Sequence, residues 1–167
     1  MRTTDSVIAF PIIFFAFLLT VTMGPSLLTI VIAIGLVIWG RYARLIRAEV
    51  LTIKNKAFVD LAKVAGCSHL NIIVSHIFPN VVNTLMVLIS LQVGWVIIVE
   101  ASLSFLGAGI PPPTPSWGNM VADGRGYIST AWWISLFPAI LIGLTVLSFN
   151  LFGDWLRNFL DPKLKQV

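Results

Sequence analysis

The hydrophobic positions of this chain gather into four long blocks, separated by shorter polar or proline-rich stretches. The blocks cover about residues 7–23, 27–43, 81–103 and 131–152. A helix of about 17 residues is roughly 26 Å long, close to the lower limit for crossing the ~30 Å hydrocarbon core of a bilayer. The pattern therefore predicts an all-α fold, a polytopic membrane bundle of about four transmembrane helices.

Prolines and glycines mark the ends of these predicted spans. Pro11 falls in the first turns of the block 7–23, where its missing N–H does least harm, and residues 24–26 form a Gly-Pro-Ser turn. The proline run 111–113 cannot continue a helix, so the third span must end before it. Pro138 interrupts the fourth span. No internal repeat or domain boundary is visible, so we expect one membrane domain over residues 1–167.

Composition supports the membrane assignment. The chain is 57% hydrophobic and 11% charged, whereas soluble domains carry about 25% charged residues. The net charge of +4 does not indicate nucleic-acid binding, because basic residues beside membrane spans serve to orient a bundle. The single cysteine, Cys67, excludes an internal disulfide. No small-residue cleavage site follows the first block, which is therefore read as a retained span rather than a signal peptide.

The basic residues predict the orientation of the bundle. With four crossings, ten of the eleven lysines and arginines fall on one face, and only Arg125 falls on the other. The ten are Arg2, Arg41, Arg44, Arg47, Lys54, Lys56, Lys63, Arg157, Lys163 and Lys165. Because positively charged loops stay inside, we expect both termini and the polar loop at about 48–80 to be cytoplasmic, and the proline-rich loop to be external.

The polar loop contains a short amphipathic helix. Its apolar positions recur at i, i+3, i+4 and i+7, and they are Phe58, Leu61, Ala62 and Ala65. Asp60 and Lys63 lie off that stripe. The spacing predicts a helix of about two turns at the membrane surface.

The residues that follow predict a sharp elbow. Gly66 tolerates the left-handed conformation that ends many helices, and Ser68 can cap a second helix over residues 70–78 that leads through Pro79 into the third span. On periodicity alone two interpretations stay open. The elbow either rests on lipid headgroups or presents a ridge to a partner protein.

Five strings in this chain resemble one family in the same order. Asp60-Leu61-Ala62, then Gly66, then His76-Ile77-Phe78-Pro79-Asn80 is similar to the cytoplasmic "EAA" loop of ATP-binding-cassette importer permeases. The other strings lie at residues 40–47, 100–107, 112–120 and 149–164. Together they resemble the C-type subunits of the dipeptide/oligopeptide/nickel permease group.

The resemblance implies a translocation subunit of an ATP-driven importer in the cytoplasmic membrane of a bacterium or archaeon, with di- or oligopeptides as the expected solute. It implies a second permease chain, two ATPase subunits and an external or periplasmic solute-binding protein as partners, besides membrane lipid. ATPase docking is implied for Phe58, Asp60, Leu61, Ala62, Gly66, His76 and Pro79. The alternatives are a nickel-importing permease of the same family and a nontransporting scaffold or inactive fragment.

Family members are generally longer at the N-terminus, with further spans there. We therefore expect residues 1–167 to be a partial permease domain, a fragment of a longer protein. The alternatives are an internal start and a reduced subunit.

The chain carries few groups that could do chemistry. Glu100 lies near the outer end of the third span; it and Gln92 are candidates for the translocation path, and a structural carboxylate bonded to Ser102 or backbone is the alternative. His69 and His76 are two helical turns, about 10.5 Å, apart, too far for one metal ion, so no metal or other cofactor is expected. The chain has no Gly-Lys pair, so the phosphate-binding loop of an ATPase is absent and ATP must be hydrolysed elsewhere.

Overall fold

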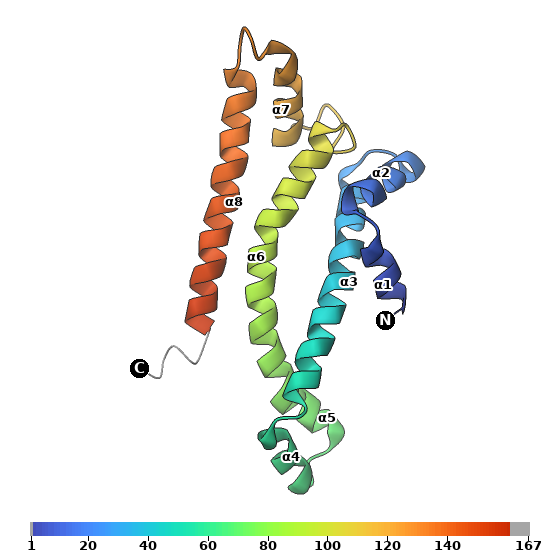
Figure 1. Ribbon diagram of the computed structural model, residues 1–167, viewed down its shortest axis with the longest axis vertical. Helices are drawn as coiled ribbons and strands as arrows, with labels where there is room; N and C mark the ends of the chain where they lie inside the picture. The colour runs from blue at the N-terminus through green and yellow to red at the C-terminus, as the bar shows by residue number, and fades with distance from the viewer. Residues whose placement is uncertain (1, 161–167) are drawn as a thin grey trace.

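Three long helices, successively antiparallel, dominate the computed structural model, which describes residues 2–160. Helices α3 (Leu27–Ile53), α6 (Phe78–Phe105) and α8 (Trp133–Leu160) run side by side, with α6 between the other two (Figure 1). Within the described range these are the three helices long and apolar enough to cross a membrane. The predicted all-α membrane bundle is thus confirmed, and three of its expected spans appear as long helices.

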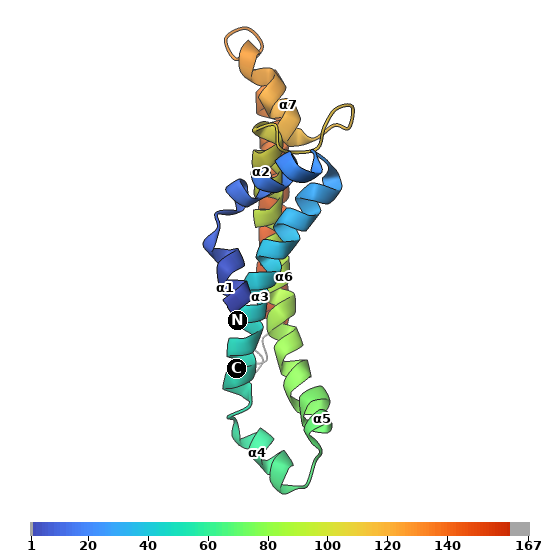
Figure 2. The ribbon, with the colours of Figure 1, turned by 90° about the vertical axis from the view of Figure 1, so that its right-hand side faces the viewer.

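The continuous helix expected over residues 7–23 is wrong. That segment forms two helices, α1 (Arg2–Ala9) and α2 (Ile12–Met23), with a break at Pro11, whose ψ of 131° is extended. Pro11 has no N–H to donate and disfavours a helical conformation in the residue before it, so the helix cannot run through. The 12 residues of α2 reach only about 18 Å. Both α1 and α2 pack against α3 instead (Figure 2).

Helix α3 extends ten residues beyond the predicted end at residue 43. Its N-terminus is capped by Ser26, whose hydroxyl accepts the Thr29 N–H at 3.1 Å. The extension carries α3 past the apolar block toward α4 (Ala57–Val64), so that the loop expected from residue 48 begins as helix. The end of the molecule where α4 lies is called the α4 end below, and the opposite end is called the α7 end.

The segment between α4 and α6 forms the predicted elbow (Figure 2). Helix α5 (His69–Asn71) leads into a π-helix, η1 (Ile72–Ile77), and then directly into α6. Proline at position 79 lacks the N–H that would bond the Ser75 carbonyl and its ring crowds that carbonyl, which accounts for the wider π turn just before it. The Asn80 side-chain amide donates to the His76 carbonyl at 2.7 Å and satisfies it.

The proline-rich segment contains a helix that the sequence did not predict. Helix α7 (Trp117–Gly124) packs against α6 and α8 (Figure 1), and the 3-10 turn η2 (Arg125–Tyr127) follows it directly. Ser116 caps α7 by accepting the Asn119 N–H at 3.1 Å. The expected interruption at Pro138 is also wrong, because α8 continues through it. Pro138 lies in the second turn of α8, where it removes one hydrogen bond, the one to the Ile134 carbonyl, without ending the helix.

Two apolar clusters hold the bundle together. The cluster toward the α7 end joins α2, α3 and α6, and its buried members are Ala16, Ile30, Ala33, Ile34, Val99, Leu103 and Ala108. The cluster at the α4 end joins α3, α4, η1 and α6 through Ile53, Val59, Ala62, Ile72, Ile77 and Val81. Gly153 lets α8 approach α6 closely, since it lies against Ser90 and Leu91.

Candidate functional site

Helix α4 is a two-turn helix held in place by an elbow at Gly66. Gly66 has φ +79°, and its N–H bonds the Lys63 carbonyl while the Cys67 N–H bonds the Ala62 carbonyl. These paired bonds form a Schellman cap, which requires the left-handed conformation that glycine adopts without strain. Ser68 then accepts the Asn71 N–H at 3.3 Å and starts α5. The predicted stop and cap are both confirmed.

The apolar stripe expected on α4 is divided between two faces. Val59 and Ala62 are buried against the α4-end cluster. Phe58, Leu61 and Val64 instead face outward, with exposed fractions of 37%, 69% and 87%. We call these three outward residues the α4 ridge. The sequence-based prediction included neither Val59 nor Val64. Helical spacing could have placed Val59 on the inner face, three residues before Ala62, and Val64 on the outer face, three residues after Leu61.

Charged side chains flank the α4 ridge without covering it. Lys63 Nζ lies 2.8 Å from Asp60 Oδ1, and both side chains are more than half exposed. An exposed pair of this kind contributes little to stability. It leaves the charged atoms of both residues accessible to a partner.

The ridge contacts the π-helix through one aromatic pair. The rings of Phe58 and His76 have centroids 6.4 Å apart at a tilt of 48°. His76 is half-buried and Pro79, one turn further, is exposed. The structure therefore brings five of the predicted docking residues, Phe58, Asp60, Leu61, Gly66 and His76, to one end of the molecule, whereas Ala62 points inward.

The two candidate path residues lie on α6, far from the elbow. Glu100 accepts a hydrogen bond from Ser104 Oγ at 2.6 Å, and Ser102 instead donates to the Ile98 carbonyl at 2.7 Å. The expected partner Ser102 is thus wrong; Ser104 lies one full turn from Glu100, the spacing that brings helix side chains together. Gln92 is half-buried and lies two turns nearer the α4 end.

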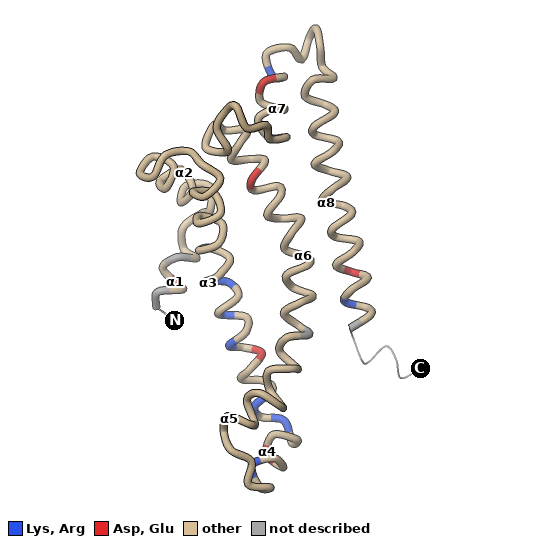
Figure 3. Tube along the Cα trace, turned by 180° about the vertical axis from the view of Figure 1, so that it is seen from behind, with Lys and Arg blue, Asp and Glu red and all other residues tan. Residues whose placement is uncertain are grey.

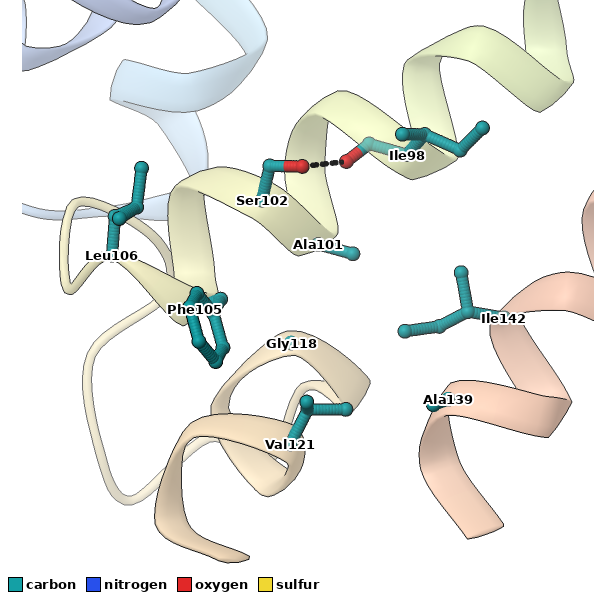
Figure 4. A pocket seen from close by; sticks show the side chains of 9 residues that line it. All are labelled: Ile98, Ala101, Ser102, Phe105, Leu106, Gly118, Val121, Ala139 and Ile142. Atoms are coloured by element: carbon teal, nitrogen blue, oxygen red, sulfur yellow. Dashed lines mark hydrogen bonds between the residues drawn. The ribbon is translucent and has the colours of Figure 1, made fainter. Parts of the chain in front are cut away.

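An apolar cavity opens between α6, α7 and α8, close to the α7 end (Figure 4). It measures about 340 Å³, and Phe105, Val121 and Ile142 are among the side chains that line it. Its one lining hydroxyl, that of Ser102, is already engaged with the Ile98 carbonyl. The cavity therefore offers a polar solute no free side-chain donor.

Basic residues are concentrated toward the α4 end. Figure 3 shows them along the lower part of α3, around α4 and near the lower end of α8, and at the opposite end beside α7. Arg44 pairs with Asp5 of α1, and the Arg41 guanidinium lies over the Trp95 ring, 5.0 Å from its centroid. The predicted segregation of charge holds for the described residues, and Lys163 and Lys165 lie outside them. Among residues 2–160 no group of three or more His, Cys, Asp or Glu side chains could hold a metal ion.

Comparison with known proteins gives one consistent result. Residues 1–166 match the family described as binding-protein-dependent transport system inner membrane component. The chain is similar to a putative peptide transport system permease protein of Brucella suis, 46% identical over 165 residues, which are 99% of this chain and 56% of that protein. It is also similar to a glutathione transport system permease protein of Salmonella typhimurium, 41% identical over 165 residues and 54% of that protein. The chain thus spans about half the length of these relatives.

Proposed function

The chain belongs to the family of binding-protein-dependent transport system inner membrane components, and we propose that it forms the translocation subunit of an ATP-driven importer of di- or oligopeptides. The names of its relatives, which specify peptide and glutathione transport, support a small peptide as the solute. Permeases of this kind are not enzymes. In this proposal two partner ATPase subunits hydrolyse ATP, a second permease completes the path and an external binding protein delivers the solute.

The proposal places the α4 end in the cytoplasm. Trp133 and Trp155 are 22 residues apart on α8, or about 33 Å along its axis, which matches a bilayer with tryptophan at both interfaces. The basic residues of α3 and α4 lie toward one end of that frame. The preference of basic segments for the inner side supports the orientation.

The observation that carries the proposal is the position of the α4 ridge between two long helices. Residues 54–56 connect α4 to the end of α3, and the Gly66 elbow connects it to α6. The inner face of α4 packs on Ile53 of α3 and Ile77 of η1. A force on the outer face is therefore delivered to both helices at once, because close-packed side chains transmit displacement.

This geometry suggests how ATP binding drives the path. The two ATPase subunits close on ATP and carry the α4 ridge with them. Helices α3 and α6 then tilt together, so the path alternates between openings on the two sides of the membrane. The chain supplies position and leverage, and it takes no part in covalent chemistry.

The test is a charge placed on the ridge of the full-length permease, co-expressed with its partner subunits. Leu61→Asp puts a carboxylate in the centre of the apolar ridge, and burying an unpaired charge in an interface costs several kcal/mol. We expect co-purification of the ATPase to fall by about tenfold or more while the permease pair stays monodisperse in detergent.

Leu51→Asp is the matched control, because Leu51 is an exposed leucine (42%) on α3 near the same end but outside the ridge. It should retain the ATPase. Undiminished ATPase yield and intact peptide uptake in Leu61→Asp would refute the docking role. A permease pair that never binds an ATPase, in wild type as well, would favour the scaffold alternative.

A further inference from the structure

Glu100 stands apart from every other charged residue of the bundle. In the halves of α3, α6 and α8 nearest the α7 end, it is the only Asp, Glu, Lys or Arg. A charge inside a membrane span is costly, so intramembrane ionisable groups usually have a function. The transport mechanism proposed above assigns no role to the Glu100 carboxylate.

The carboxylate is held in a defined orientation. Ser104, its hydrogen-bond donor at 2.6 Å, is only 2% exposed. Two glycines enclose that serine, since a Cβ at Gly109 would overlap it and one at Gly118 would lie 2.7 Å from its own Cβ. The serine therefore cannot turn away, and it fixes one oxygen of Glu100.

The rest of the carboxylate is available. An ionised carboxylate accepts about four hydrogen bonds, and the described residues supply the one from Ser104. Neither of the two ion pairs in the described part of the chain includes Glu100. The side chain is half-buried rather than sealed, so a ligand can reach it.

Glu100 also lies on a face of α6 that the other long helices leave open. Val99 and Leu103 pack toward α2 and α3, and Ala101 faces α7 and α8. At 100° per residue, Glu100 falls between these two faces, in line with residues seven and eleven positions before it. Those residues are Val93 and Ile89, of which Ile89 is 45% exposed.

We propose that Glu100 binds the N-terminal ammonium of the peptide during translocation, with Ser104 as the residue that positions it. This inference rests on the proposed import of peptides. An ammonium carries three donors and a full positive charge, and charge-assisted hydrogen bonds are about twice as strong as neutral ones. A cationic ligand also offsets the cost of keeping the carboxylate charged inside the span. The site selects solutes by a free amino terminus, whatever their side chains.

The experiment compares a dipeptide with its N-acetylated form, using the full-length permease reconstituted with all partner subunits. Wild type should take up the free-amine peptide in preference. Glu100→Gln keeps the shape and removes the charge, so the KM for the free-amine peptide should rise about tenfold while uptake of the acetylated form is unchanged. Ser104→Ala, which keeps the charge but loses the donor, should give a smaller loss in the same direction.

Asp123→Asn is the matched control, because it removes an exposed carboxylate from α7 near the same end. It should leave the preference intact. An unchanged preference in Glu100→Gln and Ser104→Ala would overturn the proposal. Failure of Glu100→Gln alone to assemble would also overturn it, by assigning the carboxylate to a basic side chain of the partner permease. Wild type that binds its ATPase yet takes up neither peptide would refute peptide import itself, and this inference with it.

Discussion

Gly118 and Gly124, near the α7 end of this bundle, serve a different purpose from Gly66 at the α4 end, although Gly24 and Gly107 share the positive φ of Gly66. At the α7 end glycines permit backbones to touch: a Cβ at Gly118 would overlap the Ala101 carbonyl, and one at Gly124 would lie 2.7 Å from the Ser135 backbone nitrogen. At the α4 end, a Cβ at Gly66 would meet no atom within 4 Å. There the glycine is needed for its backbone conformation, φ +79°.

Glycines therefore allow close helix packing at the α7 end, whereas Gly66 sets the direction of α4 at the other end. Helix α7 approaches α6 at Gly118 and α8 at Gly124 so closely that it cannot slide past either helix without collision. Helix α4 is attached on one face and open on the other, and its elbow sets the direction of the exposed ridge. We infer that, in the proposed transport cycle, relative movement of the helices concentrates away from the α7 end.

The largest expected effect is that of Gly118→Ala. The new methyl group meets a backbone atom rather than the flexible end of a side chain, so α7 must move away from α6. Overpacking of this kind costs about 3 kcal/mol, toward the upper end of its usual range. The apparent Tm of the purified full-length complex should fall by about 6 °C or more, or the complex should lose monodispersity.

Gly143→Ala is the control for that result. A Cβ there meets nothing within 4 Å, and Gly143 lies inside α8, where alanine is the better helix former. Its Tm should equal or slightly exceed that of the wild type. A Gly118→Ala complex as stable as the control would show that α7 is loosely seated, contrary to the comparison above.

A smaller and more local effect is expected for Gly66→Ala. Alanine in the left-handed conformation costs about 1–2 kcal/mol, enough to redirect the elbow but not to unfold the bundle. Peptide-stimulated ATP hydrolysis should fall severalfold while the Tm of the permease pair stays within about 1–2 °C of the wild type, because the strain is local.

Gly66→Asn tests the stated cause, because asparagine tolerates the left-handed region better than alanine does. It should recover most of the coupling. Equal loss in both variants would mean that the absence of any side chain at position 66 matters, rather than its backbone angle.

Sequence periodicity predicted the long helices because each is a sustained apolar block. It failed where a helix break depends on one residue, or where a short helix depends on tertiary contacts. The block at 7–23 reads as continuous, yet Pro11 divides it, and the short α2 persists because it buries Ala16 against α3 and α6. Helix α7 was not predicted, because prolines dominate the segment before it. Ser116, which precedes an eight-residue run of mixed apolar and polar residues, was nevertheless a signal for a helix N-cap.

The sequence predicted the local motifs of the candidate site better than it predicted which side chains are exposed there. The Gly66 and Ser68 signals are local, so their roles follow from the sequence. Which face of α4 turns inward depends on Ile53 and Ile77, which come from other elements, and no local pattern contains them. The partner of Glu100, by contrast, follows from helix spacing, because Ser104 lies four residues further on and Ser102 only two. Gly109 and, from α7, Gly118 then enclose Ser104.

The smallest effect is expected midway between the two ends, for Gly94→Ala. A Cβ at Gly94 would lie 2.8 Å from Asn150 Oδ1, but that atom ends a side chain that can rotate away. The gain in helix propensity from glycine to alanine, about 0.8–1 kcal/mol, offsets part of the collision, so the net loss of stability should stay below about 1 kcal/mol.

In the double variant with Asn150→Ala the colliding amide oxygen is gone, and the effects of the two changes on stability should be non-additive by about 0.5 kcal/mol or more in the stabilising direction. Thermal melts of the wild type, the two single variants and the double variant measure this coupling. A loss in Gly94→Ala as large as that in Gly118→Ala would extend the closely packed region along the whole of α6, and the contrast between the two ends would then reduce to the elbow alone.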